Sequence, residues 1–352
     1  MTAKAPQAPR PVPTLEDVAR LAGVSTATVS RCLNTPDRVV KSTRDRVMSA
    51  VDQLGYAPNF GARALAAKRT NTIGAIIPTM ENAIFARGLQ AFQEELGLHG
   101  MTLLVASSSY SEDVEREQIR TLCARGADAL LLIGHHRSQG TLDFLEARSV
   151  PVLVAWVYDP DKPQPSIGFD NRAAMREMAE LVIAKGHRRI GVISAPCDSN
   201  DRASERVQGI REAMAAHGLP ADAMALHETP YSIENGAAAF RQVMDCPDPP
   251  TAVMCGNDVL AVGALRAARQ MGLSVPDDVS ITGFDDIELA QLVDPPLTTV
   301  HVPHRDMGRM AARLLVQQLN GDGPMASTRL DTYLCDRETL GVAPRQRRHI
   351  AR

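Results

Sequence analysis

The sequence predicts a small all-α bundle at the N-terminus, followed by a large α/β body built on parallel sheets. Apolar residues recur at helical spacing in three segments between residues 14 and 54. From Ile73 onward, short β-rich runs alternate with amphipathic helical patterns, and this alternation is typical of parallel strands covered by helices on both faces. At 352 residues, the chain is long enough for two or three domains.

Residues 1–13 are rich in proline and alanine and contain no apolar run. We therefore expect a disordered arm and not a signal peptide, which needs an apolar core segment. No apolar stretch elsewhere approaches the length of a membrane span. The six cysteines lie far apart without a C-x-x-C pair, which favours free thiols over a zinc site or disulfides. The expected location is the cytoplasm, with no membrane partner.

Residues 14–34 have the pattern of two short helices joined by a tight turn. Thr14 is a suitable N-cap, Asp17 completes a variant of the capping box, and Gly23 ends the first helix. On a helical wheel, small side chains of the second helix face its neighbour: Ser25, which is also a suitable N-cap, Thr28, Val29 and Cys32. Small or polar side chains lie on the opposite side: Thr26, Ala27, Ser30, Arg31 and Asn34.

A third helix is predicted over residues 43–54, with Gly55 just after its C-terminus. Through Thr72 the chain carries eleven Lys and Arg against five acids, whereas the remainder carries 27 against 36. A basic head on an acidic body suggests that only the head meets a polyanion. The outward face of the second helix would fit the major groove of DNA, where Arg31 can reach guanine. On pattern alone, a generic three-helix bundle is the alternative.

The motif T-L-E-D-V-A-R-L-A-G-V-S-T-A-T-V-S-R, which begins at Thr14, and the later L-G-Y-A-P-N closely resemble the headpiece signature of the lactose–galactose repressor (LacI/GalR) family. The resemblance extends to about Pro344 and implies a helix-turn-helix DNA-binding headpiece over residues 14–59. It also implies that Thr26, Ala27 and Arg31 read bases. The full set of headpiece residues that we expect at the DNA is Thr14, Ser25, Thr26, Ala27, Thr28, Ser30, Arg31, Asn34, Tyr56 and Asn59.

Residues 60–72 resemble the hinge of the same family. The segment is rich in alanine, which permits a helix, but it is too short to be a stable helix in isolation. We expect it to fold only when DNA and a partner copy support it. The resemblance implies that Leu65 wedges into the minor groove and kinks the DNA, with Ala62 close by. The alternative is a plain linker that contains one stray leucine.

The body should contain two series of β-rich runs. The first series comprises residues 73–78, 101–107, 127–134 and 150–156, and the second comprises 190–195, 251–256 and 279–284. Helices are predicted at 85–96, 172–183 and 304–319, and a late strand at 328–338. Two such series indicate two α/β lobes, and open α/β sheets bind ligands at the C-terminal ends of their strands.

This organisation agrees with the resemblance, which implies a two-lobed body like the periplasmic sugar-binding proteins over residues 73–344. The chain should cross between the lobes near Asp170, Val302 and Leu330. The expected lobes are therefore about 73–170 with 303–330, and about 171–302 with 331–344, followed by a basic tail over 345–352.

Candidate ligand residues stand where strands end. Asp and Asn exchange hydrogen bonds with sugar hydroxyls, and Arg can fork onto a carboxylate or phosphate. With the positions that the resemblance adds, the expected effector-binding residues are Phe85, Asp170, Arg202, Arg206, Tyr231, Asn257 and Asp285. Asp258 favours a helix-capping role over ligand contact, and Asp286 that of a turn residue. Trp156 suits the core as well as a stacking platform.

The sequence does not favour an enzyme or a metalloprotein. The pairs His135–His136 and His301–His304 do not place two ligands on one helix face, so hydrogen-bonded or solvated histidines are expected, with no metal and no cofactor. The nucleophile-elbow, Walker and dinucleotide-binding glycine motifs do not occur.

The function predicted from these observations is that of a DNA-binding transcriptional regulator of the repressor type that responds to a sugar or sugar acid bound between the lobes. A homodimer should place two headpieces on a pseudo-palindromic operator. Because no leucine heptads follow Pro344, a dimer is expected and not a tetramer. The alternative is a sugar-handling α/β enzyme or a solute-binding protein that carries an accessory basic bundle.

Overall fold

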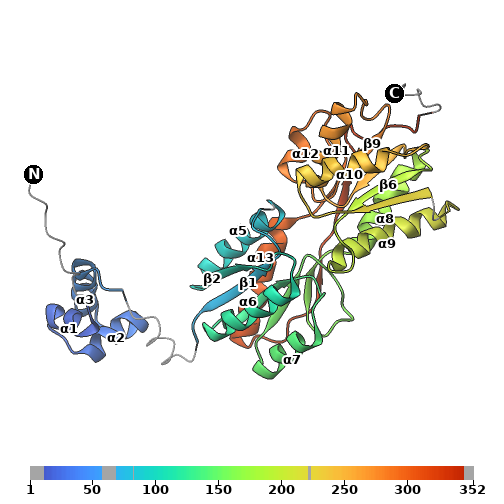
Figure 1. Cartoon of the computed structure of the whole chain (residues 1–352). Coiled ribbons are helices and arrows are strands. Elements are labelled where there is room, and N and C mark those ends of the chain that lie inside the picture. The colour runs from blue at the N-terminus through green and yellow to red at the C-terminus, as the bar shows by residue number, and fades with distance from the viewer. Residues whose placement is uncertain (1–11, 58–68, 82, 221–222, 345–352) are drawn as a thin grey trace, which may run out of the picture. The chain divides into compact units, whose positions relative to one another are not determined.

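The computed structural model describes residues 12–57, 69–81, 83–220 and 223–344. These residues belong to two compact units that divide after Thr70. The first unit is helical and the second is α/β (Figure 1), so the predicted fold class is confirmed. Several predictions lie outside the described residues: most of the N-terminal arm, the tail over 345–352, most of the hinge, and Asn59, Ala62 and Leu65.

The first unit, which we call the headpiece, consists of three helices and one short 3-10 turn. They are α1 (Leu15–Ala22), α2 (Thr26–Asn34), η1 (Pro36–Arg38) and α3 (Lys41–Leu54). The capping box is present, since the Thr14 side chain accepts from the Asp17 N–H at 3.3 Å and the Asp17 carboxylate accepts from the Thr14 N–H at 2.9 Å. Gly23, with φ +63°, ends α1 in the left-handed conformation that glycine adopts at low cost.

Small aliphatic side chains from all three helices fill the headpiece core. Val18, Val29 and Val47 are completely buried, and Cys32 is 3% exposed. The inward side predicted for α2 is therefore correct at Val29 and Cys32. The Ser25 hydroxyl accepts from the Thr28 N–H at 3.2 Å and caps this helix. Capping and packing thus hold a helix whose Thr and Ser residues have poor helix propensity.

The body contains a six-stranded parallel sheet, which defines its first lobe (Figure 1). In spatial order, the strands are β11 (Thr328–Arg329), β5 (Ser166–Gly168), β4 (Val152–Ala155), β3 (Ala129–Ile133), β1 (Thr72–Ile77) and β2 (Thr102–Ser107). The helices of this lobe are α5 (Ala83–Leu98), α6 (Glu112–Ala124), α7 (Gln139–Arg148) and α13 (His304–Asn320). Alternate residues of β1 face different clusters, as in a strand that is covered on both faces: Ile73 and Ile77 pack with α5, and Ile76 packs with α6.

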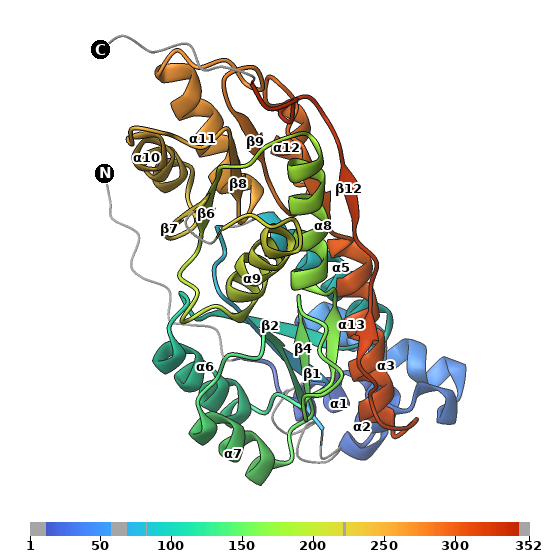
Figure 2. The same ribbon diagram turned by 90° about the vertical axis from the view of Figure 1, so that its right-hand side faces the viewer.

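The second lobe contains a four-stranded parallel sheet. Its strands, in spatial order, are β7 (Met224–Glu228), β6 (Ile190–Ser194), β8 (Ala252–Cys255) and β9 (Ser280–Thr282). Its helices are α8 (Asn171–Ala184), α9 (Asp201–Ala216), α10 (Ile233–Met244), α11 (Asp258–Gln270) and α12 (Glu288–Leu292). Helices α8 and α9 pack together on one side of this sheet, and α10 and α11 on the other, as Figure 2 shows.

The chain passes between the two lobes three times in the described residues. It crosses between β5 and α8, between β10 (Thr299–His301) and α13, and between β11 and β12 (Tyr333–Cys335). The single late strand predicted over 328–338 is wrong. That stretch is split, because β11 pairs in parallel with β5 of the first lobe, whereas β12 pairs antiparallel with β10.

Helices α5 and α13 approach each other closely beside the first sheet. At their contact, a Cβ on Gly308 would collide with the carbonyl oxygen of Gly88, so position 308 needs the absence of a side chain. A Cβ on Gly88 would also lie 2.6 Å from the Trp156 ring. This contact brings the first turn of α13 and the end of β4 against the same part of α5.

Candidate functional site

The outward side of α2 is the first candidate site. Thr26, Ala27, Arg31 and Asn34 are exposed, as predicted from the helical wheel, whereas Ser30 is only half-buried and accepts from the Asn34 amide at 3.2 Å. In the part of the chain that the structure describes, no acidic side chain forms an ion pair with Arg31. The guanidinium is therefore available to a ligand outside the headpiece.

Four other residues predicted to contact DNA cap helices or pack against the core of the headpiece. The side chains of Thr14, Ser25 and Thr28 take part in the two N-caps. Tyr56 is half-buried against the headpiece core. Thr14 and Ser25 are still exposed, so a backbone phosphate can reach them. Hydroxyls and helix N-termini are common phosphate partners.

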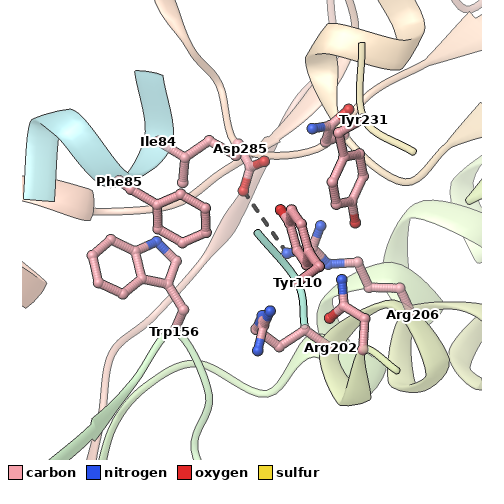
Figure 3. Close-up of a pocket in the computed structure, with 10 residues that line it drawn as sticks. Ile84, Phe85, Tyr110, Trp156, Arg202, Arg206, Tyr231 and Asp285 are labelled. Carbon is pink, nitrogen blue, oxygen red and sulfur yellow. Dashed lines mark ion pairs between the residues drawn. The ribbon is translucent and has the colours of Figure 1, made fainter. Parts of the chain in front are cut away.

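The second candidate site is a cavity between the two lobes of the body. Its lining from the first lobe is Ile84, Phe85, Tyr110 and Trp156, and from the second lobe Asn200, Arg202, Arg206, Tyr231, Asn257 and Asp285. Figure 3 shows these side chains converging from both lobes. Most of them follow the C-terminal ends of parallel strands or begin the helices after them, where open α/β sheets bind ligands.

Six of the seven predicted effector residues line this cavity, and Asp170 does not. The Asp170 carboxylate caps α8 by accepting from the Ala173 N–H at 2.9 Å, and it borders a different hollow beside Arg176 and Arg329. The sequence reasoning missed Ile84, Tyr110 and Asn200. Tyr110 stands shortly after β2, a strand-end position that the same rule could have selected. Asn200 is the N-cap of α9.

Asp285 is the most unusual group in the cavity. It is 1% exposed, and both of its carboxylate oxygens lack a hydrogen-bond partner among the described residues. The nearest cation is Arg206, with Nη2 at 3.9 Å from Oδ1. Burial raises the pKa of Asp285 to about 7, against the opposing effect of Arg206 and Arg202. A buried acceptor without a donor is costly, so this carboxyl is suited to receive hydrogen bonds from a ligand.

Asn257 presents a complementary group nearby. Its side-chain oxygen caps α11 by accepting from the Leu260 N–H at 2.9 Å, and its Nδ2 is buried without a partner in the described residues. The prediction that Asp258 caps this helix is wrong, because Asn257 is the N-cap. Asp258 instead accepts from the Ile287 N–H at 2.8 Å and from the Thr299 hydroxyl at 2.5 Å. It thereby holds the turn that carries Asp285.

Arg206 is held rigidly toward Asp285. Its Nε donates to the Asn171 oxygen at 2.8 Å, and its Nη1 donates to the Gly256 carbonyl at 2.6 Å. The guanidinium carbon also lies 3.8 Å from the centre of the Phe284 ring, in a cation–π arrangement. Since these contacts fix the plane of the guanidinium, the Nη2 edge is directed at the cavity beside Asp285 (Figure 3).

Arg202 stands one turn earlier on α9 and connects to the first lobe. Its Nη1 donates to the Asp201 carboxylate at 2.9 Å, and the same carboxylate accepts from the backbone N–H of His135. Burial acts to raise the pKa of the Asp201 carboxyl, but Arg202 and the His135 N–H together hold this pKa below its ordinary value. The first turn of α9 therefore bridges the two lobes at one side of the cavity.

Aromatic rings form the opposite wall. Phe85 and Trp156 pack edge to face, with ring centres 5.3 Å apart. Tyr110 of the first lobe and Tyr231 of the second also line the cavity, with their ring centres 6.1 Å apart. Trp156 is 3% exposed and also lines the cavity, so it belongs both to the core and to the wall. Its φ of +62° is uncommon for a bulky residue, and such strain tends to occur at functional sites.

Two further features bear on the class of site. In the described ranges, no three His, Cys, Asp or Glu side chains gather in a way that could hold a metal ion. Within the same ranges, no helix combines the length and the apolar character needed to cross a bilayer.

Asp286 adopts a turn conformation, with φ +52°, as predicted, and it also pairs with Arg337 at 2.6 Å and with His301 at 2.8 Å.

Comparisons with known proteins cover both candidate sites. Residues 14–59 match the family described as bacterial regulatory proteins, lacI family, and residues 179–340 match the periplasmic binding protein-like domain. The transcriptional repressor CytR of Escherichia coli (strain K12) is 35% identical over 318 residues, which are 90% of this chain and 93% of that protein.

Solved structures agree over nearly the whole chain. The lac repressor dimer bound to operator and the anti-inducer ONPF is similar with a TM-score of 0.83 and 28% identity, over 93% of this chain and 99% of that one. The complex of the transcriptional regulator CelR with cellobiose is similar with a TM-score of 0.68 and 32% identity, over 93% and 99% of the two chains.

Proposed function

The chain belongs to the lacI family of bacterial regulatory proteins, and on this premise we propose that a sugar or sugar acid, bound in the cavity between the lobes, controls its affinity for operator DNA. The observation that carries the proposal is the pairing of two unsatisfied buried groups in one cavity. The Asp285 carboxyl lacks donors and the Asn257 amide lacks an acceptor, among the described residues.

The chemistry of the cavity supports a polyhydroxylated ligand. Hydroxyl groups both donate and accept, so a sugar can satisfy Asp285 and Asn257 together. Phe85 and Trp156 offer an apolar surface for the ring of such a ligand. Arg202 and Arg206 can in addition pair with a carboxylate, which would extend the ligand class to sugar acids. The similar CelR structure contains cellobiose.

The headpiece supports the DNA-binding half of the proposal. Thr26, Ala27 and Arg31 form a compact exposed face on α2, of the size that can enter a major groove and contact base edges. The similar lac repressor is a dimer on its operator. We infer that this chain likewise acts as a homodimer on a two-fold site, as a repressor and without catalytic activity.

A ligand screen tests the effector half. Full-length protein is heated with individual sugars, sugar acids and nucleobases, and the unfolding temperature is recorded. A ligand of the proposed class should stabilise the wild type and leave Asp285→Asn unchanged. The stabilising compound should then shift operator affinity in a fluorescence anisotropy titration by about 5- to 150-fold, the usual range of allosteric coupling. Stabilisation by nucleobases alone would contradict the carbohydrate class.

A further inference from the structure

Four hydrogen bonds and one ion pair form a closed ring of contacts beside the cavity. Arg206 Nε donates to the Asn171 oxygen at 2.8 Å, and the Asn171 Nδ2 donates to the Trp156 carbonyl at 3.1 Å. The Trp156 indole N–H donates to His304 Nδ1 at 3.2 Å, and His304 Nε2 donates to the Asp285 carbonyl at 3.2 Å. The ion pair between Asp285 and Arg206 completes the ring.

The ring passes through two of the three places where the chain crosses between lobes. Asn171 is the first residue of α8, just after the crossing that follows β5. His304 is the first residue of α13, just after the crossing that follows β10. Trp156 belongs to the first lobe, and Arg206 and Asp285 belong to the second. The two crossing residues therefore tie an aromatic side chain of one lobe to the charged pair of the other.

The partners of His304 determine its protonation state. An indole nitrogen can only donate, so His304 Nδ1 must accept, and the single ring proton must stand on Nε2, where a carbonyl accepts it. A second proton on Nδ1 would face the indole N–H. Burial lowers the pKa of His304 to about 3, so the neutral form that the geometry requires is also the form present at neutral pH.

We propose that His304 is a positioning residue of the effector cavity: its imidazole holds the Trp156 indole and the Asp285 turn at the separation at which both face one ligand, without touching that ligand itself. His304 is not one of the residues that line the cavity. It is 3% exposed, and both of its imidazole nitrogens already have partners, Trp156 and the Asp285 carbonyl. Only the expected effect of His304 on affinity for a sugar or sugar acid rests on the proposed function.

The single tryptophan of the chain makes the ring observable. The indole N–H of Trp156 gives one resonance in a nitrogen-edited NMR spectrum of the full-length protein. In His304→Phe a flat ring remains but the acceptor is lost, so this resonance should move upfield. Its hydrogen exchange should become about tenfold faster, the factor for one hydrogen bond of ordinary strength. An unchanged indole resonance in this variant would overturn the proposal.

Two further variants separate positioning from folding. His304→Gln keeps one donor and one acceptor and should return the resonance toward its wild-type position. His301→Gln is the matched control, because His301 lies on the same segment but contacts Asp286 and Tyr333 outside the ring; it should leave the indole unaffected. If circular dichroism shows that His304→Phe is unfolded, His304→Asn replaces it, since the shorter amide cannot span both partners.

Calorimetric titration with D-glucose and D-gluconate tests the affinity statement. If either compound binds the wild type, His304→Phe should weaken binding about tenfold and His304→Gln by less than about threefold. Equal losses in both variants, or a similar loss in His301→Gln, would show that His304 acts only through general stability. If neither compound binds the wild type, the carbohydrate proposal fails for these probes, whereas the indole resonance still decides whether His304 positions the ring.

Discussion

The recognition face of the headpiece and the cavity of the body differ in how far apart their residues lie along the chain. Thr26, Ala27 and Arg31 lie within two turns of one helix, so a helical period brings them together. Phe85 and Asp285 are 200 residues apart in sequence and meet only because two sheets place their strand ends against each other. The first kind of site can be read from a local pattern, whereas the second depends on the whole fold.

The difference also appears in how each site treats its polar groups. On α2 the base-reading candidates are exposed, and water satisfies them before DNA binds. In the cavity, the Asp285 carboxyl is buried and depends on its neighbours and its ligand. Substitutions should therefore be far more costly in the cavity than on the helix face, and the following predictions test this contrast in order of expected effect.

The largest effect is expected for Arg206→Met. The change leaves the Asn171 oxygen and the Gly256 carbonyl without their donor and removes the cation beside Asp285. Loss of a buried charged partner costs roughly 3–5 kcal/mol, so affinity for the effector found in the screen should fall more than about 100-fold in calorimetry. Operator binding without effector should persist. Arg176→Met, which changes an exposed arginine on α8, serves as the control. An equal loss of effector affinity in this variant would show that the cavity position of Arg206 is not the cause.

The next effect concerns pH and the stability of the body. Burial raises the pKa of Asp285 in the folded state to about 7 from its ordinary value of 3.8. The folded protein therefore holds this proton more tightly than the unfolded chain does. The contribution of this proton to the free energy of unfolding is fully present below about pH 4, is lost as the pH rises toward 7, and stays lost above pH 7.

Chemical unfolding at pH 5 and pH 8 measures this dependence, which should amount to a few kcal/mol at most. The raised pKa of buried Asp258 acts in the same direction, so the contribution of Asp285 is the part that Asp285→Asn removes. A variant with the same pH dependence as the wild type would show that the carboxyl is not protonated in the folded state at pH 5.

A smaller effect is expected for Arg31→Ala on the headpiece. A bidentate contact to a base is worth about 1–3 kcal/mol of discrimination, so the preference for operator over random DNA should fall by roughly that amount in competition binding assays. Arg46→Ala, exposed on α3, should leave the preference intact. If affinity for both DNAs fell equally in Arg31→Ala, this side chain would contact phosphate and not a base.

The smallest effect is expected for Ser25→Ala. The hydroxyl accepts from the Thr28 N–H at the start of α2, and loss of such a cap costs about 1 kcal/mol. Hydrogen exchange of the headpiece amides should accelerate by a corresponding factor, while the body amides stay unchanged. Ser42→Ala, in the exposed first turn of α3, is the control. Faster exchange in the body as well would mean that the two units do not unfold independently.

The predictions from sequence succeeded where chemistry is local. The capping box at Thr14, the glycine end of α1 and the buried side of α2 all follow from residues within a few positions of one another. They failed where the meaning of a residue depends on distant partners. Asp170 has the same strand-end position as Asp285, but it caps α8 and lies outside the cavity. The late strand failed for a related reason, because its two halves pair with different sheets.

The sequence by itself determined the class of the protein and its helical head and α/β body, because periodicity, caps and a strongly marked motif are local properties. Strand-end positions and the family resemblance added most of the residues that line the cavity. Only the tertiary structure decided which of those residues meet and in what state. It joined His304 to Trp156 and Asp285 across the lobes, left the Asp285 carboxyl buried without a donor among the described residues, and raised its pKa. Burial and hydrogen-bond partners depend on segments far apart in sequence, and no local pattern contains them.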